Sequence, residues 1–340
     1  MKKILLILSI SFVTLFAAND SHTDLNTEIK STAMNALNEY EAERVLAVVI
    51  DSQSGKIVLA FDSTREKSKD LKEHIKSIAR FSYEPGSVIS PLVYALALES
   101  KKTQESELIN MHQGRFEIGK KVITDFYKFD YLSSENILVY SSNVGIAQIA
   151  LRLDGRDIYD GFNKFGLGQS SLDNIGSEDV GSLSNGLRSN IDIYKATNSY
   201  GYALRVNLLQ LVQAYSAFNN DGLMVQPSFI EYHNSQKVLD EKTAQRMKKI
   251  LIKAVENGTG SNAKLEGVEI GGKTSTAHIV ENGKYVNKYI ASFVGFVNTK
   301  DKKYIVATVF VKPKKSQFAS QTSVFLFKDI ATLLKDGDIK

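Results

Sequence analysis

Three short segments of the sequence carry side chains that together could catalyse acyl transfer. Ser87 and Ser90 are three residues apart at the start of an apolar run, Ser141 and Asn143 are two residues apart, and Lys273 opens the segment Lys-Thr-Ser-Thr. A serine near a helix N-terminus has backbone N–H groups and a positive dipole end beside it. When it attacks a carbonyl carbon, a neighbouring base must take its proton. The set therefore predicts a serine nucleophile that acts through a covalent intermediate.

The residues around the nucleophile would support this chemistry. A serine and an asparagine can relay a proton and hold a substrate amide, and Lys273 supplies positive potential. The hydroxyls of Thr274 and Thr276 can bind the terminal carboxylate of a peptide, and backbone N–H groups can stabilise the oxyanion. Simpler structural roles stay open, because Ser87 and Asn143 are also residue types that cap helices.

Apolar periodicity indicates the elements that must position these residues. Helices are predicted at 24–40 (capped by Asp24), from 87 onward, and at 137–153, 208–219, 241–255 and 324–334, and strands at 45–50, 57–61, 268–280, 289–297 and 304–312. Strands at both ends with helices between them predict an α+β fold, in which helices flank one antiparallel sheet and an all-helical lobe is inserted. We expect a sheet lobe at about 24–86 and 262–337, and a helical lobe at about 87–261.

The motifs and their surroundings resemble the transpeptidase domain of class B penicillin-binding proteins, within the serine β-lactamase superfamily. That family carries the set S-x-x-K, S-x-N and K-T-G in this order. The resemblance extends over about residues 24–334 and is carried by the segments at 83–88, 141–147, 201–211, 272–277 and 291–296. It implies Ser87 as the nucleophile, Ser141 and Lys273 as its catalytic partners, Asn143, Thr274, Ser275 and Thr276 as substrate-binding residues, and the N–H groups of Ser87 and Thr276 as the oxyanion hole.

Two departures from the family pattern affect the chemistry. Ser90 stands where the family has its general-base lysine, and a hydroxyl is no base at neutral pH. Loss of a positioned base typically slows a reaction by about 10²- to 10⁴-fold. Ser275 replaces the family glycine, and because alternate strand residues share a face, its side chain should lie on the same face as Lys273 and crowd the site. The pattern favours a cleft that binds rather than turns over its ligand.

The N-terminus predicts export. Lys2 and Lys3 precede an uncharged, apolar or small segment of about fifteen residues that ends in Ala17-Ala18, as in a secretory signal peptide at 1–18. We therefore expect a periplasmic protein, or one anchored in the inner membrane if the leader is not cleaved. Few residues separate this leader from the first helix, so the N-terminal module usual in class B proteins is expected to be absent.

Composition excludes several functions. The net charge is +4 from 42 basic and 38 acidic residues, which is too small to predict nucleic-acid binding. Without cysteines there are no disulfides or thiolate metal sites, and the five histidines show no ligand spacing. We therefore expect no metal and no cofactor.

Two functions are compatible with these residues. The first is an exported, catalytically impaired penicillin-binding protein of peptidoglycan metabolism, which binds a D-Ala-D-Ala-like stem peptide or a cell-wall synthesis partner and reacts weakly, if at all, with β-lactams. The second is a slow but active serine DD-transpeptidase or DD-carboxypeptidase, in which Lys273 deprotonates Ser87 through Ser141. The extent of labelling by penicillin distinguishes them.

Overall fold

A five-stranded antiparallel sheet organises the molecule. The computed structural model describes residues 21–172, 175–231 and 234–337. The strands β1 (Arg44–Asp51), β2 (Ile57–Asp62), β9 (Glu269–Glu281), β10 (Lys284–Asn298) and β11 (Lys303–Val311) are arranged in the order β2-β1-β11-β10-β9. The first two strands, both predicted, form a hairpin, and β1 pairs with β11 from Arg44↔Val311 to Asp51↔Tyr304. Strand β9, which carries Lys273, is therefore an edge strand.

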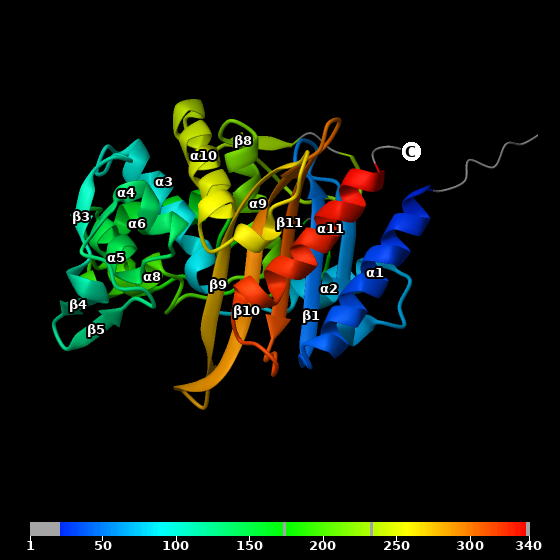
Figure 1. The fold of residues 1–340 in the computed structure, drawn as a ribbon, viewed down its shortest axis with the longest axis horizontal. Helices are drawn as coiled ribbons and strands as arrows, with labels where there is room; N and C mark the ends of the chain where they lie inside the picture. Colours follow the sequence, from blue (N-terminus) through cyan, green and yellow to red (C-terminus); the bar gives the residue numbers. More distant parts are fainter. Residues whose placement is uncertain (1–20, 173–174, 232–233, 338–340) are drawn as a thin grey trace, which may run out of the picture.

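Helices cover both faces of this sheet (Figure 1). On one face, α1 (Ser21–Glu39) and α11 (Ser323–Gly337) pack together and close a hydrophobic core with β1, β10 and β11. On the other face lie α2 (Leu71–Ala79) and α9 (Leu208–Asn219), while α10 (Glu241–Asn257) packs along β9. Because valines, isoleucines and phenylalanines fill both faces, the strands read as nearly continuous apolar runs.

The helical lobe lies beyond β9, on the left of Figure 1. Its helices are α3 (Ser90–Glu99), α4 (Ser134–Val139), α5 (Asn143–Leu151), α6 (Gly155–Lys164), α7 (Asn185–Arg188) and α8 (Asp192–Ser199). Short antiparallel pairs that were not predicted accompany them: β3 (Leu108–Asn110) with β6 (Tyr131–Ser133), and β4 (Arg115–Ile118) with β5 (Lys121–Thr124). A further pair, β7 (Leu223–Val225) with β8 (Ser235–Lys237), follows α9. Single-turn 3₁₀ helices lie at 63–65 (η1), 86–89 (η2), 112–114 (η3), 261–263 (η4) and 319–321 (η5).

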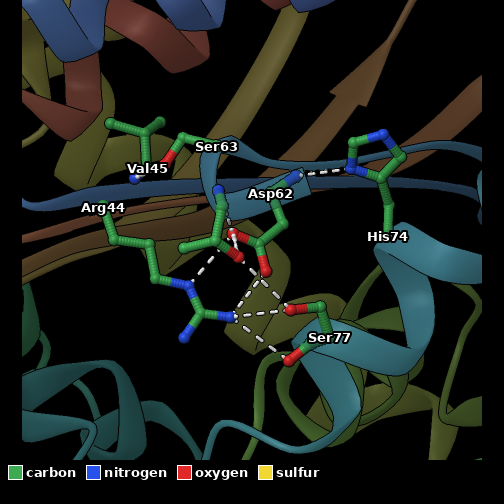
Figure 2. Close-up of polar contacts among 7 residues, drawn as sticks. Arg44, Val45, Asp62, Ser63, His74 and Ser77 are labelled. Carbon is green, nitrogen blue, oxygen red and sulfur yellow. Dashed lines mark hydrogen bonds and ion pairs between the residues drawn. The ribbon is translucent and has the colours of Figure 1, made fainter. Parts of the chain in front are cut away.

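A buried ion pair fixes the start of the sheet (Figure 2). Arg44 Nε donates to Asp62 Oδ1 at 3.0 Å and Arg44 Nη2 to Oδ2 at 2.5 Å, and the guanidinium also reaches Ser77 on α2. Burial alone would raise the pKa of Asp62, but the hydrogen bonds and the charge of Arg44 outweigh it, so the pKa is lowered. The ring of His74, also on α2, accepts the Asp62 N–H through Nδ1 at 3.0 Å. These contacts join α2 to the first two strands.

The predicted elements agree with the structure except at particular boundaries. Helix α9 has the predicted bounds, whereas α1 begins at Ser21, so Asp24 lies inside the helix and does not cap it. The predicted helix at 137–153 is interrupted, and the break contains Ser141. The predicted signal peptide lies outside the described residues. None of the helices within the described ranges is long and apolar enough to span a membrane.

Candidate functional site

The turn that carries Ser87 packs tightly on β9. Gly86 has a φ of +61°, and a Cβ atom at this position would lie 2.2 Å from Ser275 Oγ. Only glycine therefore fits, for reasons of both conformation and space. Ser87 lies within η2 and is not a helix cap, since the N-cap positions of η2 and α3 are Pro85 and Ile89. Its partly buried hydroxyl has no hydrogen-bond partner among the described residues.

Ser90 has a structural partner and no acid–base partner. It is the first residue of α3 and is 3% exposed. Its hydroxyl donates to the carbonyl of Ser199, at the end of α8, at 3.1 Å. The adjacent Asn198 is fully buried, and both polar atoms of its amide have no partner in the described structure. Through this hydrogen bond, Ser90 joins the turn that carries Ser87 to α8.

The segment after α8 is hydrogen-bonded to the turn that carries Ser87. Tyr83 and Val206 exchange backbone hydrogen bonds at 2.9 and 3.0 Å, and Gly86 N–H donates to Gly201 O at 3.1 Å. The Ala203 N–H donates to Glu84 Oε1 at 2.9 Å. Burial raises the pKa of Glu84. The resemblance had singled out residues 201–211, and the structure gives the physical reason for their presence beside Ser87.

The second motif occupies the break between α4 and α5. Ser141 has a left-handed backbone with φ 59°, and Ser142 caps α5 by accepting the Gly145 N–H at 2.8 Å. Asn143 is the first residue of the helix rather than its cap, and its Nδ2 reaches Thr124 O at 3.4 Å.

Asp125, which was not predicted, stabilises this break. It accepts the Ser142 hydroxyl at 2.5 Å and the Val144 N–H at 3.0 Å. Burial raises the pKa of Asp125 despite these hydrogen bonds. A lone aspartate after a short strand gives no sequence signal for such a role.

Lys273 meets the second motif from the edge strand. Its side chain is 1% exposed, and Nζ donates to Ser141 Oγ at 2.6 Å and to Thr274 O at 3.0 Å. No carboxylate of the described residues lies within ion-pair distance of this amine. Burial therefore lowers the pKa of Lys273 to about 7. At neutral pH the amine is divided between a cation, which can hold an anion, and a neutral amine, which can accept a proton.

The rest of the third motif divides between the two faces of β9. Ser275 shares the face of Lys273, as expected, but it is 2% exposed and lies beneath Gly86. Its hydroxyl has no partner within the described part of the chain, and neither has that of Ser292, which is directly opposite on β10. The Thr274 hydroxyl is hydrogen-bonded to the Thr259 hydroxyl at 2.6 Å, and the Thr276 hydroxyl accepts the Ala319 N–H at 3.0 Å.

Residues from three distant segments of the chain meet at the edge strand β9. The structure brings Ser141 and Lys273 into direct contact and packs the Ser87 turn on the same strand. Within the described ranges, no group of three or more histidine, aspartate or glutamate side chains could hold a metal ion.

Comparison with known proteins identifies the family of this chain. The family model for the penicillin binding protein transpeptidase domain matches residues 45–332. The probable peptidoglycan D,D-transpeptidase PenA of Neisseria meningitidis serogroup B is 31% identical over 303 residues, which are 85% of this chain and 52% of that protein. The peptidoglycan D,D-transpeptidase FtsI of Escherichia coli K12 is 28% identical over 294 residues, 84% of this chain and 50% of that protein.

The similarity extends to solved structures. The ligand-free transpeptidase domain of penicillin-binding protein 3 from Burkholderia pseudomallei superposes with a TM-score of 0.83 at 26% identity, covering 92% of this chain and 93% of that one. The chain spans about half the length of the curated relatives above. From its motifs, its fold and these matches, the chain belongs to the penicillin-binding protein family, as a class B transpeptidase domain.

Proposed function

We propose that this protein acts in peptidoglycan metabolism in the periplasm by binding the D-Ala-D-Ala end of stem peptides, with acyl transfer strongly impaired. The observation that carries the proposal is the Ser90 hydroxyl, which donates to Ser199 O at 3.1 Å where the family has its base. The nucleophile turn is still formed, and Lys273 still faces the site through Ser141. Such a cleft retains the groups that hold a peptide and lacks the group that starts the reaction.

Binding should depend on the charge of Lys273. A carboxylate is held more strongly by an ammonium group than by a neutral amine. Because burial lowers the pKa of Lys273 to about 7, binding of an anion must draw a proton onto the amine. Affinity for the peptide is therefore expected to rise as the pH falls from 8 to 6, and to weaken at high salt.

One observation favours slow catalysis as a second candidate function. The 2.6 Å contact between Lys273 Nζ and Ser141 Oγ forms a direct proton path if the amine is neutral. Ser87 Oγ would bond to the carbonyl carbon, its proton would pass to Ser141 Oγ, and the Ser141 proton would pass to Lys273. The leaving amine would later take the proton back. This route needs the neutral amine, so its rate should rise with pH while peptide binding falls.

Two experiments test these functions. NMR titration with a D-Ala-D-Ala stem-peptide mimic should shift signals around Ser87, Asn143 and Lys273 in the parent protein and much less in Lys273→Met. The variant Lys195→Met, which changes another buried lysine, is the control. An absence of shifts at saturating peptide would contradict the binding function.

Incubation with a fluorescent penicillin, followed by mass spectrometry, measures acylation, with Ser87→Ala as the blank. We expect little or very slow labelling. Rapid stoichiometric labelling at Ser87 would overturn the impairment, whereas slow labelling that accelerates with pH would favour the Lys273 route.

A further inference from the structure

Glu84 links three segments of the chain around Ser87. It lies three residues before Ser87, in the stretch that leads into η2. Its Oε1 accepts the Ala203 N–H at 2.9 Å and the Tyr285 hydroxyl at 3.2 Å. Ala203 belongs to the segment after α8, and Tyr285 lies on β10, in the hairpin that β9 and β10 form. One carboxylate oxygen therefore joins the residues that carry Ser87, the segment after α8 and the hairpin.

The contacts of Tyr285 lead back to the edge strand. Its ring packs against the ring of Tyr202, with centroids 5.2 Å apart in an edge-to-face arrangement. The Tyr202 hydroxyl in turn accepts the backbone N–H of His278, on β9, at 3.0 Å. The link that starts at Glu84 therefore ends on the strand of the third motif.

Residues 84–87, which we call the Ser87 turn, have few side-chain contacts besides those of Glu84. Pro85 has no N–H, Gly86 has no side chain, and the Ser87 hydroxyl has no hydrogen-bond partner within the described part of the chain. Glu84 therefore supplies the side-chain hydrogen bonds of this turn.

The carboxylate of Glu84 is placed asymmetrically. Oε1 accepts both hydrogen bonds, whereas Oε2 is buried and has no partner among the described residues. Burying a carboxylate oxygen without a hydrogen bond costs free energy, and burial accordingly raises the pKa of Glu84. The two contacts need only one acceptor oxygen, which the side-chain amide of glutamine also offers. A glutamine variant therefore separates the acceptor from the charge.

From these contacts we infer that Glu84 is a positioning residue, which holds Ser87 against β9 by tying the Ser87 turn to Tyr285 and to the segment after α8. Without this tie, the turn is held by its backbone hydrogen bonds and by the packing of Gly86 on β9. A shift of about 1 Å at a reacting atom can slow a reaction by about 100-fold. The consequence for ligands rests on the proposed function, because the position of Ser87 matters only to a peptide that meets it.

Amide hydrogen exchange of Gly86, measured by NMR, tests the tie without any ligand. This N–H donates to Gly201 O at 3.1 Å, a contact that no substitution of Glu84 removes directly. Glu84→Ala removes two hydrogen bonds to a charged group and should speed the exchange about 10-fold or more. Glu84→Gln keeps the acceptor and should exchange like the parent protein. The amides of α9 report global stability and should not change.

The hairpin side of the tie has its own matched pair of variants. Tyr285→Phe removes one hydrogen bond from a residue that is 50% exposed, so the fold tolerates it, and Gly86 exchange should become about 2- to 10-fold faster. Tyr289→Phe is the control, because it removes a tyrosine hydroxyl of the same hairpin whose partner is Asn287.

The inference is overturned if Gly86 exchange is unchanged in Glu84→Ala or in Tyr285→Phe. It is also overturned if the exchange accelerates equally in Glu84→Gln, in Tyr289→Phe or throughout α9. Should Glu84→Ala not fold, Tyr285→Phe decides the outcome.

Affinity for a D-Ala-D-Ala stem-peptide mimic, from NMR titration, tests the consequence for ligands. Loss of one contact with a displaced Ser87 turn should raise the Kd about 2- to 10-fold in Glu84→Ala, with parent affinity in Glu84→Gln. Parent affinity in Glu84→Ala despite faster Gly86 exchange overturns the positioning role. If no protein binds the peptide while Gly86 exchange accelerates in Glu84→Ala, the proposed function fails and the tie stands.

Discussion

Replacing Lys273 with methionine should stabilise the protein at neutral pH, although it removes two hydrogen bonds. Burial lowers the pKa of this lysine from 10.5 to about 7. A shift of this size corresponds to about 5 kcal/mol against the charged amine in the folded state, at 1.36 kcal/mol for each pH unit. The side chain is 1% exposed, so solvent screening scarcely reduces the penalty. Methionine has a similar length and no charge to desolvate.

Linkage between protonation and folding determines how the stability difference between the two proteins changes with pH. Between pH 7 and 10.5 the unfolded chain holds a proton on Lys273 that the folded chain has released. Titration of Lys273 therefore raises the free energy of unfolding of the parent protein as the pH rises, by about 1.4 kcal/mol per pH unit in the middle of this range. Methionine does not titrate. The stability advantage of Lys273→Met should thus shrink by about 3 to 4 kcal/mol between pH 7 and pH 10.

Urea denaturation of both proteins at intervals from pH 6 to 10 measures this difference. Other titrating groups are common to the two proteins, and the lost hydrogen bonds to Ser141 and Thr274 add an offset that varies little with pH. The control is Lys195→Met, which removes a buried amine that has Asp192 as an ion partner at 2.9 Å and should destabilise the protein. A stability difference for Lys273→Met that does not change with pH would refute the reasoning.

Three further predictions concern Gly86, the pair Ser90 and Ser275, and His74. Gly86→Ala should lower the free energy of unfolding by about 1–3 kcal/mol from backbone strain, and further through the 2.2 Å clash with Ser275 Oγ. Adding Ser275→Gly removes that clash and should recover part of the lost stability. Thermal denaturation of the two single variants and the double variant, as a double-mutant cycle, measures the recovery. Ser90→Lys combined with Ser275→Gly should increase penicillin labelling of Ser87 above either single change; a folded but unreactive double variant would contradict the inferred arrangement. Burial lowers the pKa of His74 in the folded protein, so as the pH falls the unfolded chain binds this proton first. The free energy of unfolding should therefore decrease as the pH falls from about 6.5, and it should decrease less steeply in His74→Gln. Identical pH profiles for the two proteins would exclude this contribution.

Local patterns were enough to predict most of the elements around the site. The apolar run at 208–219 has helical length, and a capping box of Asn207 and Gln210 marks where the helix begins. The terminal strands are rich in β-branched and aromatic residues, and their hairpins are closed by local turns. The helix predicted at 137–153 ran through the break at Ser141, although consecutive polar residues interrupt the apolar stretch there.

The contacts that define the candidate site could not be predicted in this way. The partner of Ser90 is the backbone of Ser199, 109 residues away, and a carbonyl carries no sequence signature. Asp125 meets the second motif only because β4 and β5 fold back onto α5. The expected crowding by Ser275 assumed an open cleft, whereas its side chain lies beneath Gly86. Each of these outcomes depends on tertiary packing between distant segments.

The pairing of β1 with β11 has a consequence for biosynthesis. Strand β1 ends at Asp51, and its second neighbour in the sheet is complete only at Val311. At a synthesis rate of about 5–20 residues per second, roughly 15 to 50 seconds pass between the synthesis of β1 and that of its partner β11. An unpaired apolar strand edge is a template for pairing with another chain. The β1 edge of the first hairpin therefore stays unpaired until the last strand has been made.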